Sequence, residues 1–195
     1  MADQPTFAQL VSLACHDLRT PLATASGFAH TLQRLDTVEA PADRYAEMIG
    51  AASEQMAQLL DLLAAAARIE GGRFEFQARP ADSRELADAA VALLRDGDAV
   101  AEGDGLAVQV DPGWAHTGLA ALAECVRRHG ALDQVTLGVD GASVSVGPLV
   151  EGVGAIALGY DLKDFGAAVG SRVLVAMGAE VEPSGDSLAV RLPTV

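Results

Sequence analysis

The sequence is poor in aromatic residues, in basic residues and in cysteine. Aromatic side chains make up 4% of the 195 residues, so a hydrophobic core has to be built mostly from alanine, valine and leucine. Only 13 lysines and arginines stand against 27 acidic residues, which gives a net charge of −14. Nucleic acids and anionic membrane surfaces are bound through clustered basic residues, so this balance argues against both partners.

The two cysteines, Cys15 and Cys125, show neither CxxC nor metal-ligand spacing, which favours a reduced, intracellular protein. The N-terminus has no basic and apolar signal sequence. The longest apolar stretch, residues 59–67, is broken by Asp61 and is too short to span a bilayer. We therefore expect a cytoplasmic protein without a membrane span, long enough for two small domains.

The first third of the sequence predicts two long helices. Residues 6–35 carry apolar side chains at steps of three and four, with Pro21 inside the pattern, and residues 43–69 carry a second apolar stripe. The segment 36–43 between them predicts a turn. Such helices form an antiparallel hairpin, and one hairpin covers only one side of each stripe. We therefore expect a homodimer in which two hairpins form a four-helix bundle.

After residue 72 the pattern changes to short alternating and helical segments. Strands are predicted at residues 73–77, 106–110, 135–139, 143–146, 180–182 and 187–192, and helices at residues 83–94, 112–129 and 162–177. Residues 1–72 and 73–195 are therefore expected to form separate domains. The fold class is α+β: a helical hairpin followed by an α/β sandwich whose mixed sheet carries helices on one face.

The segment 15–22 reads Cys-His-Asp-Leu-Arg-Thr-Pro-Leu. With Leu18 at the centre of the buried stripe, His16 lies about 160° away around an ideal helix and faces solvent. A neutral imidazole is a good nucleophile near pH 7, and Asp17 can hold its tautomer or accept its proton. Thr20 follows one turn later on the same face. This combination predicts an exposed, nucleophilic histidine whose chemistry suits phosphoryl transfer.

Three further residues belong to this candidate site. Arg19 can offset the charge of a phosphate. Ala23 and Gly27 continue the face of His16 with small side chains, which leaves room for a partner protein to dock. The other histidines have no comparable neighbours. No cofactor-binding or metal-binding residue is expected in this chain.

Residues 16–22 resemble the phosphoacceptor box of two-component sensor histidine kinases, His-(Glu/Asp)-x-x-(Thr/Asn)-Pro-Leu, at every fixed position. The resemblance implies a HisKA-type dimerisation domain in which Asp17 assists phosphorylation of His16 and Thr20 orients water for dephosphorylation of a partner. It also implies response-regulator receiver domains as partners, with an upstream hybrid kinase as a further candidate. Mg²⁺ would then come with the receiver domain rather than with this chain.

The second half resembles the ATP-binding domain of the same kinases in the order of its elements, but the nucleotide motifs are missing. Aligning residues 119–129 with the kinases' asparagine box puts Ala121 and Cys125 where two asparagines hold phosphate and Mg²⁺. A hard cation prefers oxygen ligands, which neither residue supplies well. No aspartate follows residues 143–146 to read an adenine, and residues 164–170 contain few glycines. We therefore expect a degenerate ATPase-like domain that has lost its nucleotide.

The leading hypothesis is a histidine phosphotransferase of a bacterial phosphorelay, which shuttles a phosphoryl group between receiver-domain aspartates through His16. Three alternatives stay open. The first is a divergent ATP-dependent sensor histidine kinase, and the second is a non-catalytic pseudokinase that regulates a response regulator. The third is a phosphatase for phosphorylated receivers that uses Thr20 without phosphorylating His16.

Overall fold

The computed structural model describes the backbone of residues 7–34, 40–161 and 163–194. The chain divides into two compact units, and the boundary lies between Arg73 and Phe74. None of the helices in the described ranges combines the length and the apolar character that a bilayer span requires.

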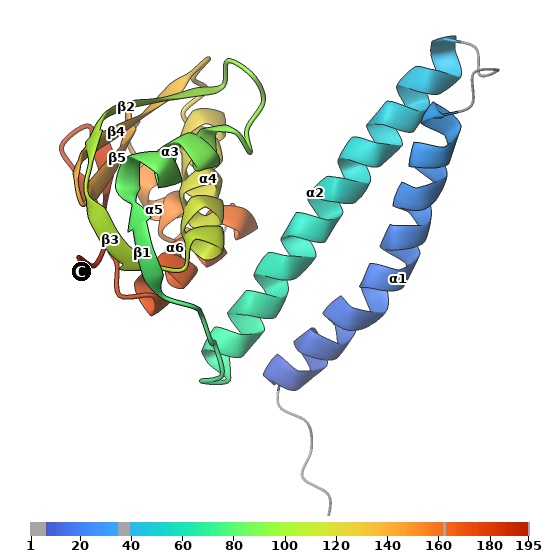
Figure 1. Cartoon of the computed structure of the whole chain (residues 1–195), viewed down its shortest axis with the longest axis horizontal. Coiled ribbons are helices and arrows are strands. Elements are labelled where there is room, and N and C mark those ends of the chain that lie inside the picture. The colour runs from blue at the N-terminus through green and yellow to red at the C-terminus, as the bar shows by residue number, and fades with distance from the viewer. Residues whose placement is uncertain (1–6, 35–39, 162, 195) are drawn as a thin grey trace, which may run out of the picture. The chain divides into compact units, whose positions relative to one another are not determined.

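The first unit is an antiparallel hairpin of two long helices, α1 (Phe7–Gln33) and α2 (Ala40–Glu70) (Figure 1). The α1 helix continues through Pro21. The α2 helix begins three residues earlier than the apolar stripe predicts, so Pro41 lies in its first turn rather than in the preceding loop. Proline is well tolerated there, because the first N–H groups of a helix have no intrahelical acceptor.

Small side chains line the contact between the two helices, which lets the helices approach closely. Among the side chains that the structure describes, the buried residues on the facing stripes are Cys15 and Ala29 on α1, and Ala46, Gly50, Ser53, Ala64 and Ala67 on α2. Among the hairpin side chains that the structure describes, six large apolar ones are exposed instead. They are Phe28, Leu32, Met48, Ile49, Met56 and Leu59, which we call the apolar seam. The hairpin therefore buries one apolar face and leaves a second one open.

The second unit contains a five-stranded sheet with the strand order β2-β4-β5-β7-β6 (Figure 1). Its strands are β2 (Ala99–Gly105), β4 (Val135–Gly141), β5 (Ser143–Gly147), β6 (Glu180–Ser184) and β7 (Ser187–Arg191). The β2–β4 pair is parallel and the other neighbouring pairs are antiparallel, so the sheet is mixed as predicted. The short strands β1 (Arg79–Asp82) and β3 (Ala107–Val110) form a separate antiparallel pair.

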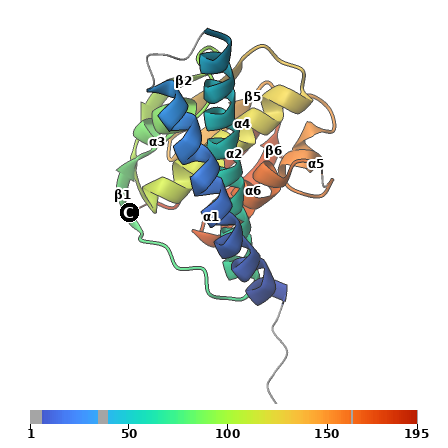
Figure 2. The same ribbon diagram turned by 90° about the vertical axis from the view of Figure 1, so that its right-hand side faces the viewer.

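Helices cover one face of the five-stranded sheet (Figures 1 and 2). They are α3 (Ser83–Val91), α4 (Pro112–His129), α5 (Val153–Ala157) and α6 (Phe165–Ala176). Alternate residues of β4 and β5 are buried, namely Val135, Leu137, Val139, Val144 and Val146. This alternation is the one expected for a sheet packed on one side, and the predicted α+β fold class is confirmed.

The prediction of a strand at residues 73–77 is wrong, because Phe74, one of the two aromatic residues that produce the alternation there, packs against Trp114 of α4. The ring of Phe74 lies edge to face with Trp114, with ring centroids 5.7 Å apart, and also stacks with Phe76 at 6.0 Å. The backbone N–H of Gln77 is bonded by the side chain of Asp111 rather than by a neighbouring strand.

The sequence patterns also missed β1, β2 and α5. The strand β2 lies at one edge of the sheet and carries charged residues, so its sequence lacks the alternation of a half-buried strand. Gly103 shows how closely β2 approaches its neighbour, since a Cβ there would lie 2.0 Å from the Val139 carbonyl oxygen. The helix α5 has only five residues and is preceded by Gly152 at a φ of 82°, so no helical period develops.

Candidate functional site

The predicted phosphoacceptor motif lies within α1. The backbone of His16, Asp17 and Thr20 is helical, whereas the side chains of these residues lie outside the part of the chain that the structure describes. The solvent exposure of His16 and its contact with Asp17 therefore stay predictions.

Helix geometry nevertheless shows which face of α1 position 16 occupies. At about 100° per residue, it lies roughly 120° from the buried face around Ala29 and roughly 140° from the apolar seam. Ala23 and Gly27 share the face of position 16, and both are exposed. A side chain at Gly27 would meet no atom within 4 Å. This third face is therefore separate from both apolar faces and has the low relief that a docking partner needs.

Arg19 has a partner that the sequence did not suggest. Its exposed guanidinium pairs with the exposed carboxylate of Asp61 across the hairpin. An ion pair between exposed groups contributes about 1 kcal/mol or less, so a phosphate can compete for this guanidinium at little cost. The only sequence signal for Asp61 is that it interrupts an apolar stretch of α2.

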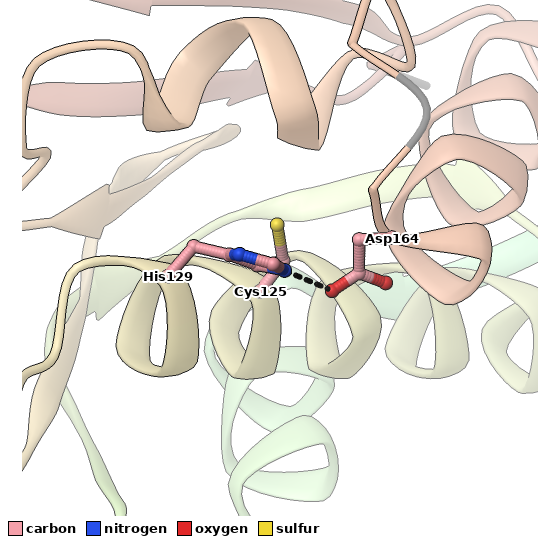
Figure 3. A group of neighbouring side chains, drawn as sticks. All are labelled: Cys125, His129 and Asp164. Carbon is pink, nitrogen blue, oxygen red and sulfur yellow. Dashed lines mark ion pairs between the residues drawn. The ribbon is translucent and has the colours of Figure 1, made fainter.

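A second polar group lies between the end of α4 and the start of α6 (Figure 3). Asp164 is buried and caps α6, and its Oδ1 accepts a hydrogen bond of 3.1 Å from the backbone N–H of Ala167. Its Oδ2 accepts a hydrogen bond from the guanidinium of Arg128. Burial raises the pKa of Asp164, but the Ala167 N–H and Arg128 outweigh this and hold the pKa below its ordinary value. The carboxylate is therefore ionised at neutral pH.

Cys125 and His129 follow one another by one turn on α4 and lie against Asp164 (Figure 3). The Nε2 atom of His129 is 3.3 Å from Oδ2 of Asp164. It makes no hydrogen bond, and among the described residues it is the one buried side-chain nitrogen or oxygen without such a partner. Burial and the neighbouring carboxylate raise the pKa of Cys125 to about 12, so the thiol is protonated at neutral pH. Sequence reasoning missed this cluster, although Cys125 and His129 have the i,i+4 spacing of one helix face.

The α4 positions aligned with the kinases' two asparagines are used for packing. Cys125 is fully buried. Ala121 lies at a close crossing of α4 and α6, where a Cβ at Gly170 would be 3.1 Å from the Cβ of Ala121 and 3.2 Å from the carbonyl oxygen of Gly118. Arg128, one turn further along α4, is tied to Asp164. These positions therefore hold two helices together and present no carboxamide oxygen.

The ion pair of Asp164 should make the second unit sensitive to acid. A carboxylate whose pKa is lowered in the folded state stabilises the fold fully above its ordinary value of 3.8, and this stabilisation is lost as the pH falls through the folded-state pKa. Asp164→Asn is expected to lower the free energy of unfolding by about 1–2 kcal/mol at pH 7. The difference from the wild type should shrink below about pH 4, as the pH falls through the ordinary and then the folded-state pKa of Asp164.

The fluorescence of Trp114, the single tryptophan, reports unfolding of this unit. Asp161→Asn is the control. Asp161 is also an acidic residue in an ion pair, with Lys163, but its side chain is 44% accessible and therefore far more exposed than that of Asp164. A free-energy difference between Asp164→Asn and wild type that is the same at pH 7 and pH 3 would contradict the assignment.

Comparison with known proteins bears on both units. Residues 8–72 match the His Kinase A (phospho-acceptor) domain family, HisKA. The histidine protein kinase DivJ of Caulobacter vibrioides is 37% identical over 91 residues, which cover 45% of this chain and 15% of DivJ.

Two solved structures share the fold over most of the chain. Full-length ShkA, solved in complex with AMPPNP, superposes with a TM-score of 0.62 at 18% identity, covering 97% of this chain and 47% of ShkA. The histidine kinase AdeS of Acinetobacter baumannii has a TM-score of 0.57 at 16% identity, covering 92% of this chain and 98% of that structure. The chain thus spans about half of ShkA and a much smaller part of DivJ.

Proposed function

We propose that this chain, a histidine-kinase-like two-component protein with a HisKA phosphoacceptor domain and an ATPase-like domain, is a histidine phosphotransferase. An imidazole nitrogen of His16 attacks the acyl phosphate of a receiver-domain aspartate, so the P–N bond forms as the P–O bond breaks. The aspartate leaves as a free carboxylate. The phosphoryl group then passes from His16 to an aspartate of a second receiver.

Other parts of the chain have supporting roles in this proposal. Asp17 accepts or orients the imidazole proton, and Thr20 positions a water molecule for dephosphorylation. Arg19 can leave Asp61 to offset the phosphate charge, while Ala23 and Gly27 leave room for the receiver. Mg²⁺ is supplied by the receiver, because the proposed chemistry requires none from this chain. A hybrid kinase is a candidate source of the phosphoryl group, and the setting is the cytoplasm.

The observation that carries the proposal is the packing of α4 on α6. An ATP-dependent kinase needs oxygen ligands for phosphate and Mg²⁺ on α4. In this chain Ala121 packs against Gly170, Cys125 is fully buried, and Arg128 is bonded to Asp164. Opening this contact for a nucleotide would separate a buried carboxylate from its cation, which is costly. The arrangement supports a domain that keeps the fold without using ATP.

The apolar seam supports the homodimer within the same proposal. It consists of six large, exposed apolar side chains distributed over both helices of the hairpin. A second copy of the hairpin presents the same surface and can cover it in a four-helix bundle. The position of His16 outside the seam would keep the phosphoacceptor accessible in that dimer.

The divergent ATP-dependent sensor kinase is the second candidate, and the similarity to the histidine kinase DivJ favours it. The pseudokinase and phosphatase hypotheses have the same partner as the phosphotransferase, a receiver domain. They differ from it in the fate of the phosphoryl group. A pseudokinase would bind a receiver without accepting phosphate. A phosphatase would release inorganic phosphate from the receiver without a labelled intermediate on this chain.

One paired experiment separates these functions. The full chain is titrated with ATP and Mg²⁺ by calorimetry, and separately mixed with a receiver domain carrying a labelled aspartyl phosphate. The phosphotransferase predicts no nucleotide binding at micromolar protein and acid-labile label transferred from the receiver to the chain. Saturable ATP binding followed by labelling from the γ-phosphate would replace the proposal with the kinase. Loss of receiver phosphate without label on the chain would indicate a phosphatase.

A further inference from the structure

Cys125, His129 and Asp164 bring a sulfur, a nitrogen and an oxygen atom together where α4 ends and α6 begins (Figure 3). These three atoms lie within 4.8 Å of one another, and the nitrogen–oxygen distance is 3.3 Å. In a tetrahedral zinc site, with bonds of about 2.0 Å to N and O and 2.3 Å to S, neighbouring ligand atoms are roughly 3.3–3.6 Å apart. The nitrogen–oxygen pair already has this separation.

We propose that Cys125, His129 and Asp164 form a binding site for a divalent transition-metal ion, with zinc as the best-matched ion. This inference is independent of the phosphotransferase proposal, and it departs from our sequence-based expectation that the chain has no metal ligands. The site would join α4 to α6 through one ion instead of through side-chain contacts alone.

The three ligand atoms have free electron pairs, and their residues belong to α4 and to the N-terminal cap of α6. The Nε2 atom of His129 is buried and has no hydrogen-bond partner, so its lone pair can be used by a metal. Asp164 is fixed by its Oδ1 bond to Ala167, and Oδ2, bonded to Arg128, retains a second acceptor position. Cys125 and His129 lie on one face of α4 at the end of the helix, where the helix dipole favours a positive charge.

The chemistry of the ligand set selects the class of ion. A thiolate with an imidazole and one carboxylate suits zinc, whereas Mg²⁺ and Ca²⁺ prefer sites made of oxygen atoms. On binding, the S–H bond of Cys125 breaks, its proton is released to solvent and an S–Zn bond forms. One Zn²⁺ with one thiolate, one carboxylate and a neutral imidazole has no net charge, which suits a buried site. A water molecule can fill the fourth position.

Arg128 opposes the metal and therefore gives a specific test. Its guanidinium bonds Oδ2 of Asp164, but its side chain is 51% accessible and can turn to solvent. A nearby positive charge weakens binding of a cation. Arg128→Gln, which removes this charge, should tighten metal binding on the order of tenfold.

The test titrates the full, metal-free chain with Zn²⁺ alone and with Co²⁺ alone. We expect one ion per chain, about one proton released per ion in buffers of different ionisation enthalpy, and a Co²⁺ absorption spectrum of a tetrahedral site with one thiolate. His129→Gln and Cys125→Ser should each weaken binding by roughly 100-fold or more. Cys15→Ser is the matched control, because this other buried cysteine lies in α1, and it should leave the titration unchanged.

Three results would overturn the proposal. They are absence of saturable binding at micromolar metal, unchanged binding by His129→Gln, and a Co²⁺ spectrum without a thiolate contribution. Trp114 fluorescence checks that each variant is folded. If Cys125→Ser does not fold, His129→Gln and Arg128→Gln decide the question, since both side chains are partly accessible. Phosphoryl transfer to His16 is measured separately, so either proposal can fail without the other.

Discussion

Replacing His16 with glutamine is expected to abolish the label that the chain takes from a phosphorylated receiver domain. Glutamine has a similar size and polarity but no nucleophilic nitrogen, so no phosphoryl–enzyme intermediate can form. The amount of acid-labile phosphate on the chain should fall by a factor of at least about 10³, to background. The measurement is transfer of radioactive phosphate from the receiver to the chain, followed by acid treatment.

The matched control is His30→Gln on the same helix. The ring of His30 is exposed and its Nδ1 lies 3.2 Å from Oε1 of Gln33, an ordinary surface contact. This variant should accept label at the wild-type rate. Labelling that survives in His16→Gln, or that is lost equally in both variants, would remove His16 from the mechanism.

Charge placed in the apolar seam is expected to dissociate the dimer. Met48 and Met56 are 60% and 49% exposed in the single hairpin, and both would become buried against a second copy. Each buried methionine contributes about 1.5–3 kcal/mol to the free energy of dimerisation. In a twofold-symmetric dimer each substitution is present in both copies, so its effect occurs twice. The double variant Met48→Glu with Met56→Glu should therefore weaken dimerisation at least about a thousandfold. Sedimentation equilibrium over a range of protein concentrations measures the dissociation constant.

The control is a double variant that adds the same two negative charges outside the apolar seam. Leu93 and Val175 are 47% and 53% exposed in the second unit, and neither belongs to the seam. Leu93→Glu with Val175→Glu should leave the dissociation constant within about threefold of wild type, because exposed substitutions have small effects. A wild-type chain that is monomeric at micromolar concentration would contradict the role given to the seam.

Structure that depends on neighbouring residues could be predicted from the sequence. The start of α4 is an example: Asp111 bonds the backbone N–H groups of Gly113 and Trp114, and Pro112 occupies the first turn. These contacts lie within one turn, so the order of residues is enough to show them. The long apolar stripes of α1 and α2 predicted the hairpin for the same reason.

Elements that depend on distant partners could not be predicted. The cap of α3 is Asp82, and the hydroxyl of Ser83, the first residue of the helix, makes contacts with distant segments. It donates a hydrogen bond to the carbonyl oxygen of Gly141 and accepts one from Leu106. The edge strand β2 likewise owes its conformation to parallel pairing with β4, which follows it only after β3 and α4.

The two candidate sites differ in the same way: one consists of neighbouring residues and the other of residues far apart in the sequence. The predicted phosphoacceptor motif around His16 lies in one continuous segment of α1. Residues three or four positions apart in a helix lie on the same face, so the side chains of this motif can be placed from the sequence. The group at Cys125, His129 and Asp164 joins two helices, and the Arg128–Asp164 contact spans 36 positions. The sequence alone predicted the hairpin and the candidate phosphoryl-accepting residue, His16. Only the tertiary structure, through the close packing of α4 on α6, decided which distant side chains share a buried site.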